Sequence, residues 1–261
     1  MTGRLLLKGM LAGLLAGICA FAFASFYGEP TVNQAIAFEE SHAEGHSEAH
    51  AQSEMHHAVV EKQEAHSHGE QEVVSRRVQS TIGLFTGLVV YSISVGGIFA
   101  LVFAYCVGRV GRLQPRALAG VIALIAFCAV ALIPGLKYPA NPPAVGDPAT
   151  IALRTQMFFL MILVSVAAAI TAINIARRVM RRGGGWQGAL VGIGLYLLIM
   201  TVTGSCFPSF NEAPASFPSA LLWDFRMAFL GIHAVLWAAL ALVFSVLVNR
   251  PHSASRQYSP L

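Results

Sequence analysis

Six long apolar stretches divide this sequence, and they limit what it can fold into more than any other feature. Each holds about 20 residues, which as a helix is long enough to cross the roughly 30 Å hydrocarbon core of a bilayer. The stretches run over residues 5–27, 81–107, 117–136, 155–176, 187–206 and 227–248. Charged residues make up only 11% of the chain, against about 25% in soluble domains. The sequence therefore predicts an all-α polytopic membrane protein with about six transmembrane helices.

Lysine and arginine are concentrated in alternate connections between these spans. With the N-terminus in the cytoplasm, 11 of the 17 basic residues lie on the cytoplasmic side: Arg4, Lys8, Arg109, Arg112, Arg116, Arg177, Arg178, Arg181, Arg182, Arg250 and Arg256. Such clusters beside spans are the positive-inside signal. We therefore expect a multi-pass protein of the inner (plasma) membrane, surrounded by membrane lipids, with both termini cytoplasmic. The clusters are short and adjoin spans, so no nucleic acid is expected as a partner.

This topology divides the chain into four parts. Residues 1–27 form the first transmembrane helix, 28–80 a long His/Glu-rich extracytoplasmic loop, 81–248 a five-helix transmembrane bundle and 249–261 a cytoplasmic tail. All 13 acidic residues then fall on the outer side or at the outer ends of spans. An acidic outer face of this kind attracts cations.

Three glycines at four-residue spacing mark one face of the first span: Gly9, Gly13 and Gly17. Glycines at this spacing let another helix backbone approach closely, so we expect this face to pack against a helix. The spacing recurs at 83/87 and 188/192, where chance accounts for it equally well because glycine is common in membrane helices. A weak cleavage-like site near the end of the span raises the alternative of a signal peptide. The apolar run is longer than the 7–15 residues of a signal-peptide core, and we expect a retained span.

Seven of the nine histidines lie in the predicted outer loop, among carboxylates: His42, His46, His50, His56, His57, His66 and His68. The first three are four residues apart, a spacing that places them on one face if the segment is helical. Imidazole binds Zn, Cu, Fe and Ni, and by extension Co, when it is neutral. We therefore expect the loop to capture a divalent metal cation. A solvated loop with incidental histidines and a pH sensor are the alternatives.

The shorter outer connections carry other polar groups. Asn141 and Asp147 lie in a proline-rich stretch that cannot form a regular helix, and Glu212 and Asp224 precede the last span. These oxygen donors are candidates for a transport pathway, although an Asp-Pro turn and interfacial charges account for them equally simply. His233 lies inside the last span, and ionisable groups there are functional candidates. A structural histidine, hydrogen-bonded between helices, is the competing interpretation.

No enzyme is indicated. The sequence lacks an HExxH motif, a Walker A motif and a Ser or Cys nucleophile with an accompanying base pattern. No catalytic residue and no prosthetic group is expected. The four cysteines are scattered through apolar runs and show neither a disulfide framework nor a zinc pattern.

Several longer motifs carry a resemblance to a known family. They are GEPTVNQAIAFEE at 28–40, VSRRVQSTIGLFTGLVVY at 74–91, LKYPANPPAVGDPATIALRT at 136–155 and FPSALLWDFRMA at 217–228. With these motifs in this order, the chain resembles the CbtA family, the proposed cobalt transporter subunit of bacteria. The resemblance implies an inner-membrane protein linked to cobalt uptake for cobalamin synthesis. It also implies a partner, a small single-span CbtB-like subunit.

Two functional hypotheses follow. In the first, the chain is a subunit of a divalent-metal uptake transporter that captures the cation on the histidine-rich loop. Cobalt is then the metal that the resemblance implies, whereas the residues alone admit Co²⁺, Ni²⁺ or Zn²⁺. In the second, the chain is a membrane metal or pH sensor, or a scaffold, without transport activity of its own.

Overall fold

The computed structural model describes residues 2–54, 75–110, 113–143 and 145–249, and within 43–54 it describes the backbone only. Every regular element in these ranges is helical. The elements are α1 (Thr2–Phe23), η1 (Ala24–Gly28), α2 (Glu29–Glu54), α3 (Arg76–Val78), η2 (Gln79–Gly83), α4 (Leu84–Cys106), α5 (Pro115–Ala126), η3 (Phe127–Leu132), α6 (Ile133–Lys137), η4 (Pro148–Thr150), α7 (Ile151–Gly183), α8 (Gly185–Cys206) and α9 (Ser219–Asn249). In the described part of the chain, six helices are long and apolar enough to cross a membrane. The predicted all-helical membrane architecture is therefore confirmed at this level.

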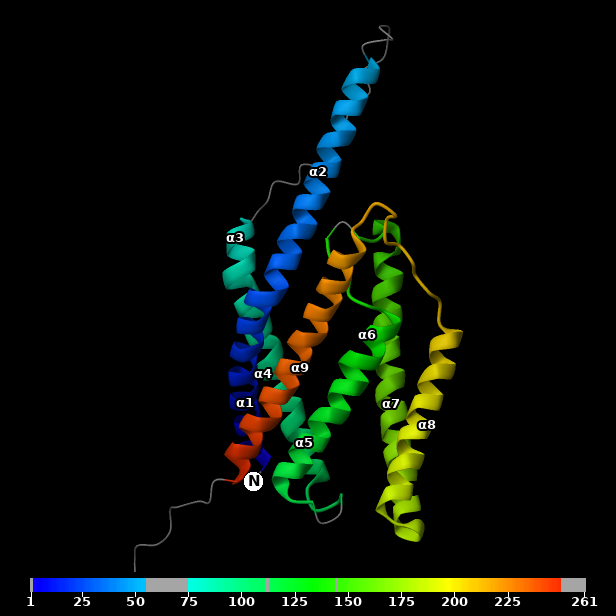
Figure 1. Cartoon of the computed structure of the whole chain (residues 1–261). Coiled ribbons are helices and arrows are strands. Elements are labelled where there is room, and N and C mark those ends of the chain that lie inside the picture. The colour runs from blue at the N-terminus through cyan, green and yellow to red at the C-terminus, as the bar shows by residue number, and fades with distance from the viewer. Residues whose placement is uncertain (1, 55–74, 111–112, 144, 250–261) are drawn as a thin grey trace, which may run out of the picture.

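The first helix does not end where the sequence analysis ends it. α1, η1 and α2 follow one another without a break, so residues 2–54 form one helix, and α2 stands clear of the other helices at its far end (Figure 1). The start of the predicted loop at 28–80 is thus helix. Pro30 lies inside this continuous helix, where it has no N–H to donate to the preceding turn, and that turn, η1, is π-helical rather than α-helical. Residues 55–74 lie outside the described residues.

The glycines of the first span lie against α4. A Cβ atom on Gly13 would collide with the carbonyl oxygen of Ser92, and one on Gly9 would collide with that of Gly96. At Gly17 the nearest α4 atom, the Cβ of Ser92, would be 3.0 Å away. The two backbones therefore approach as closely as side chains permit, which is how small residues drive helix association in membranes. Of the two later glycine pairs, 188/192 lies against α7, whereas a Cβ added to Gly87 would meet no side chain and no other helix within 4 Å in the described part of the chain.

The main core lies where α1, α4, α5 and α9 meet. Small residues of α1 face large ones of α4 and α9, so the surfaces interdigitate. The buried residues are Ala12, Ala16, Ala20, Phe99, Ala100, Phe103, Leu118, Ala119, Ala123, Leu236, Trp237, Leu240 and Phe244. Phe244 stands edge-on to Phe99 and Phe103, with ring centroids 5.2 and 5.0 Å away.

The third span, Pro115–Lys137, contains a proline near its end. Pro134 has no N–H, and its ring would clash with the carbonyl group four residues earlier. The preceding segment, η3, is π-helical, a wider winding that often accommodates such a disturbance. The span therefore stays continuous past Pro134 and delivers Lys137 and Tyr138 to the end of the bundle.

α7 and α8 form a hairpin packed side by side (Figure 1). Gly184 turns the chain between them with φ +99°, a left-handed conformation that favours glycine. Within the hairpin, the hydroxyl groups of Ser165 and Tyr196 are hydrogen-bonded at 2.8 Å.

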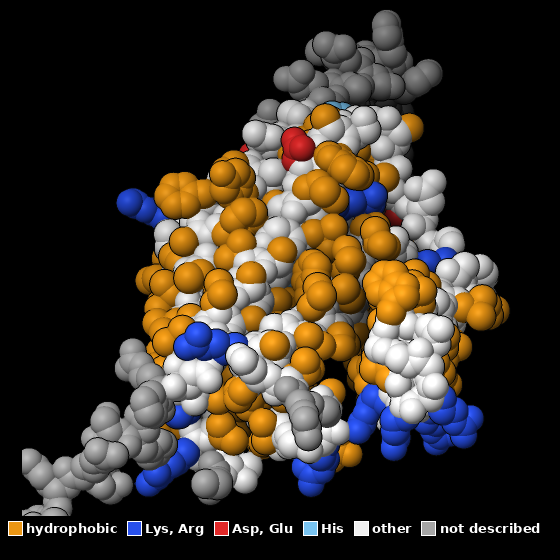
Figure 2. All heavy atoms as spheres, turned by 60° about the horizontal axis from the view of Figure 1, so that its bottom comes forward, with side chains coloured by type: hydrophobic (Ala, Val, Ile, Leu, Met, Phe, Trp, Pro, Cys, Tyr) orange, Lys and Arg blue, Asp and Glu red, His pale blue; other side chains and the backbone are white. Residues whose placement is uncertain are grey.

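Basic side chains gather at one end of the bundle. Figure 2, turned so that this end comes forward, shows Lys and Arg side chains along its rim and hydrophobic side chains above them. Among them, Arg177 donates a hydrogen bond of 2.6 Å to the carbonyl oxygen of Arg109. We call this the basic end. The described residues of the loops at 138–147 and 207–218 lie at the opposite end (Figure 1), which we call the pocket end.

Candidate functional site

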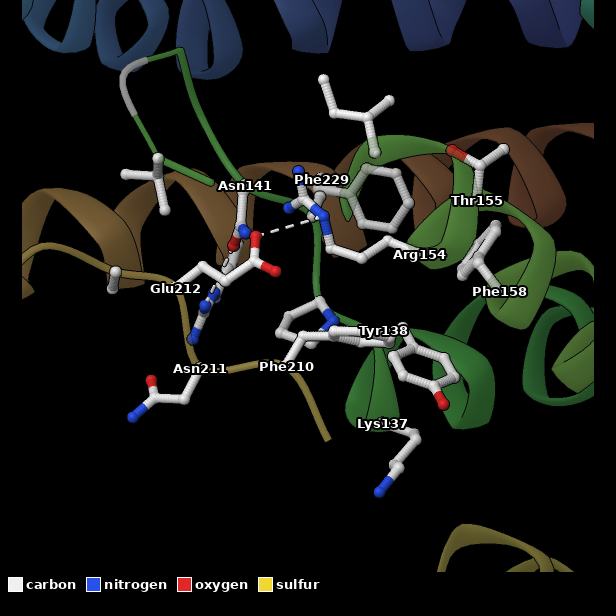
Figure 3. A pocket seen from close by; sticks show the side chains of 16 residues that line it. Lys137, Tyr138, Asn141, Arg154, Thr155, Phe158, Phe210, Asn211, Glu212 and Phe229 are labelled. Carbon is white, nitrogen blue, oxygen red and sulfur yellow. Dashed lines mark hydrogen bonds and ion pairs between the residues drawn. The ribbon is translucent and has the colours of Figure 1, made fainter. Parts of the chain in front are cut away.

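Two connections meet at the pocket end and enclose a cavity of about 410 Å³ (Figure 3). One connection is residues 138–147, which prolines keep out of a helix. The other is residues 207–218. The first turns of α7 and α9 supply the remaining walls through Arg154 and Arg226. Lys137, Tyr138, Asn141, Arg154, Phe158, Phe210, Asn211, Glu212, Arg226 and Phe229 are among the lining residues.

Glu212 joins the two connections. Its Oε1 accepts a 2.6 Å hydrogen bond from the Thr150 hydroxyl, and its Oε2 accepts one of 2.9 Å from the Asp147 N–H. Arg154 adds an ion pair rather than a hydrogen bond, with its Nε 3.3 Å from Oε2. The Thr150 and Asp147 hydrogen bonds, with help from Arg154, hold the pKa of Glu212 below its ordinary value, against an opposing effect of burial. Glu212 is therefore an ionised carboxylate whose oxygens are already engaged.

Asp147 holds the start of the next helix. Its Oδ1 accepts a 2.8 Å hydrogen bond from the N–H of Ala149, capping η4 immediately before α7. The carboxylate thus satisfies a backbone donor that the helix leaves free at its N-terminus. Asp147 is exposed and is not among the residues lining the cavity.

Asn141 faces Arg226. The Nη2 of Arg226 donates a 3.1 Å hydrogen bond to the Oδ1 of Asn141. The Nε of the same guanidinium is buried and has no acceptor among the described residues. Arg226 lies in α9, because this helix begins at Ser219, eight residues before the predicted start of the last span at residue 227. Asp224, two residues earlier on the helix, is exposed and does not line the cavity.

His233 lies deeper in α9, away from the cavity lining. Its ring packs against Phe229 and Tyr91, with centroids 4.8 and 6.3 Å away. Its Nδ1 is buried and has no hydrogen-bond partner among the described residues. The structure thus surrounds this histidine with aromatic rings and does not bring it to the oxygens of Asn141, Asp147 and Glu212.

The histidine-rich segment is described only in part. The His42 ring lies on Phe38, with centroids 4.0 Å apart, and its Nδ1 is 3.0 Å from the Phe38 carbonyl oxygen. His46 and His50 continue along α2, where the backbone alone is described, and His56, His57, His66 and His68 lie outside the described residues. Among the described residues, no three His, Cys, Asp or Glu side chains come together as a metal site.

Arg154 and Arg226 are two lining residues that the sequence does not mark as candidates. Both stand in quoted motifs, but their importance comes from partners far along the chain, Glu212 and Asn141. One available signal was an arginine within the first turns of an apolar span, a position where a charge is costly and usually functional.

A family model described as "Probable cobalt transporter subunit (CbtA)" matches residues 2–249. The match covers all six apolar helices and both connections around the cavity. No curated protein and no solved structure matches the chain.

Proposed function

The chain belongs to the CbtA family of probable cobalt transporter subunits, and on that premise we propose that it is a membrane-spanning subunit of a Co²⁺ uptake transporter serving cobalamin synthesis. The family match over residues 2–249 carries this proposal. Cobalt is the transported cargo, and no prosthetic group is part of the proposal. Ni²⁺ and Zn²⁺ are the competing cations, because imidazole and carboxylate ligands bind them as well.

In this proposal the protein lies in the inner membrane, with the basic end in the cytoplasm and the pocket end outside. The basis is the positive-inside rule, applied to arginines such as Arg109 and Arg177 at one end of the bundle. The acidic residues then face the compartment from which the cation comes.

We further propose that the histidine-rich segment captures the cation. The helical backbone of α2 supports this role, because its path puts residues 42, 46 and 50 one turn apart on one face. Several exchangeable imidazoles raise the local concentration of metal without holding it tightly.

A small single-span CbtB-like protein is the proposed partner. The word "subunit" in the family description implies an assembly. α8 supports this, because it packs on α7 and leaves large apolar side chains exposed, among them Leu190, Ile193 and Leu198. Such a face suits either lipid or another transmembrane helix.

The test is radiolabelled Co²⁺ uptake in cells that lack other cobalt importers. The cells express the chain with the small single-span protein, or either one alone, with and without excess Ni²⁺ or Zn²⁺. Saturable uptake that requires the chain and resists both competitors is the expected result. Absence of uptake, with Co²⁺ still bound by the purified full-length protein, would contradict transport.

The second candidate function is a membrane metal or pH sensor or scaffold without transport. It draws support from the pocket end, where the oxygens of Asn141 and Glu212 already accept hydrogen bonds from the protein. A cation using them as a pathway would have to displace those donors. Metal binding without flux in vesicles that contain both proteins would favour this candidate.

A further inference from the structure

We propose that the cavity at the pocket end binds a small organic anion with several carboxylate groups, and that the metal reaches the chain there as an anionic chelate. The second half rests on the proposed function, whereas the first half stands on the geometry of the cavity.

Arg226 is the first reason. Among the described residues it has no carboxylate within ion-pair distance, and its hydrogen bond goes to the neutral amide of Asn141. Its Nε is buried and has no acceptor in the described part of the chain. A guanidinium that lies in an apolar span without a counter-ion is costly. A bound carboxylate would supply both the missing charge and the missing acceptor.

The charge of the lining is the second reason. The lining contains three cationic side chains, Lys137, Arg154 and Arg226, and one carboxylate, Glu212. Glu212 is paired with Arg154, and within the described part of the chain Lys137 and Arg226 have no ion-pair partner. The Nζ of Lys137 donates to the neutral Ser209 hydroxyl at 2.8 Å. A bare divalent cation would be repelled by this surplus, whereas an anion is attracted.

The size of the cavity is the third reason. A volume of about 410 Å³ lies in the range of small-molecule pockets, roughly 300–1,000 Å³. Tyr138, Phe158 and Phe210 provide apolar walls (Figure 3). Apolar walls with a few polar groups are typical of sites for organic ligands. The planar guanidinium of Arg226 matches a carboxylate, which it can bind through two parallel hydrogen bonds.

These observations connect to the metal through charge. An anion with three or more ionised carboxylates keeps a net negative charge when it binds one divalent cation, so its complex suits the same lining as the free anion. Release from the chelate would then precede movement of the metal through the protein. The histidine-rich segment would bind the free cation, and the cavity would bind the complex of the cation with the organic anion.

Citrate is the probe that tests the site. Radiolabelled citrate, alone and with equimolar Co²⁺, is titrated onto the full-length protein in nanodiscs of zwitterionic phosphatidylcholine. We expect saturable binding that weakens at least tenfold in R226Q and several-fold in K137Q. R182Q removes an exposed arginine at the basic end and is the matched control, with unchanged binding. K137Q changes a different helix, so the test survives if R226Q fails to fold.

Three results would overturn the inference. The first is that citrate does not bind saturably, and the second is that R226Q and K137Q both bind citrate as tightly as the control R182Q. The third is that equimolar inorganic phosphate displaces citrate. The last would assign the site to phosphate or to a lipid headgroup. Co²⁺ uptake without citrate binding would refute this inference and leave the proposed function intact. Citrate binding without Co²⁺ uptake would refute the proposed function and leave the anion site.

Discussion

The hydroxyl of Thr150 donates to the Oε1 of Glu212 across 2.6 Å, although 62 residues separate them along the chain. With the Asp147 N–H and Arg154, this contact ties the connection before α7 to the connection before α9. The pocket end therefore depends on one ionised carboxylate.

The stability of the pocket end should depend on pH through Glu212. Its pKa in the folded protein lies below the ordinary value of 4.5. Its contribution is therefore complete above about pH 4.5 and is lost as the pH falls through the lower folded-state pKa. We expect wild-type protein in detergent to melt at a higher temperature than E212Q at pH 7, with the difference shrinking in acid. Thermal melts from pH 3 to pH 7 measure this, and parallel curves would contradict it.

Replacing Gly13 by alanine should disrupt the contact between α1 and α4. The added Cβ would meet the carbonyl oxygen of Ser92 on α4, and overpacking of this kind costs about 1–3 kcal/mol. We expect G13A to melt at a lower temperature than wild type. G87A is the control, because a Cβ at Gly87 meets nothing within 4 Å. If both variants melt alike, the glycines have no packing role.

The pair of Arg76 and Glu29 should stabilise the junction between the two ends of the histidine-rich segment. Their side chains are 31% and 16% exposed and lie 2.6 Å apart, Nη2 to Oε2. We expect R76E to lower the free energy of unfolding by roughly 2 kcal/mol, since hydrogen bonds between charged groups are the stronger class. Exchanging the charges in E29R/R76E should restore part of the lost free energy of unfolding. The neighbouring R77E, at an exposed position, should have little effect in the same unfolding titration. A charge exchange that fails to improve on R76E would exclude a specific pairing.

The hydrogen bond between Ser165 and Tyr196 should couple α7 to α8 weakly. Interhelical hydrogen bonds in membranes average about 0.6 kcal/mol in double-mutant cycles. S165A, Y196F and the double variant should therefore give a coupling energy of about this size. Fully additive effects in denaturant titrations would mean that the 2.8 Å contact contributes nothing to the hairpin.

Replacing His42, His46 and His50 together by glutamine should reduce Co²⁺ uptake when the metal is scarce. Imidazoles that bind the cation raise its concentration at the protein, so the loss should appear as a higher Co²⁺ concentration at half-maximal uptake. The maximal rate should change little. Alanine at Ser41, Ser47 and Ser53 alters the same turns without removing an imidazole and serves as control. Equal uptake by both triple variants at pH 7.5 would exclude capture by these histidines.

The number and order of the spans could be predicted from the sequence, because an uninterrupted run of about 20 apolar residues is rare outside helices that cross a membrane. The helical start of the predicted loop could not. Residues 39–54 are polar, show no apolar periodicity and follow Gly28 and Pro30, which usually interrupt a helix. Their helix instead continues one that is already nucleated in the membrane, and continuing a helix is easier than starting one.

The charges of the cavity were equally hard to predict. Asp147 and Glu212 stand out in the sequence as oxygen donors, yet their roles depend on the loop that brings them together with Arg154. By its sequence position alone, Arg226 resembles an interfacial charge, and only its place beside Asn141 brings it into the cavity wall. Asp147 and Glu212 are 65 residues apart along the chain, and Asn141 and Arg226 are 85 residues apart, so these pairings leave no local sequence pattern.

Because α2 is long, its far end lies well away from the charged side chains around the cavity. Phe38 packs on Phe217 of the pocket end, with ring centroids 5.1 Å apart, and the helix continues from there to Glu54. At 1.5 Å per residue this continuation is about 24 Å long, or about three Debye lengths at physiological ionic strength. Beyond the first two turns, the potential of Arg154 and Arg226 is therefore largely screened. A cation can gather at the tip of the helix without feeling the charge that draws an anion to its base.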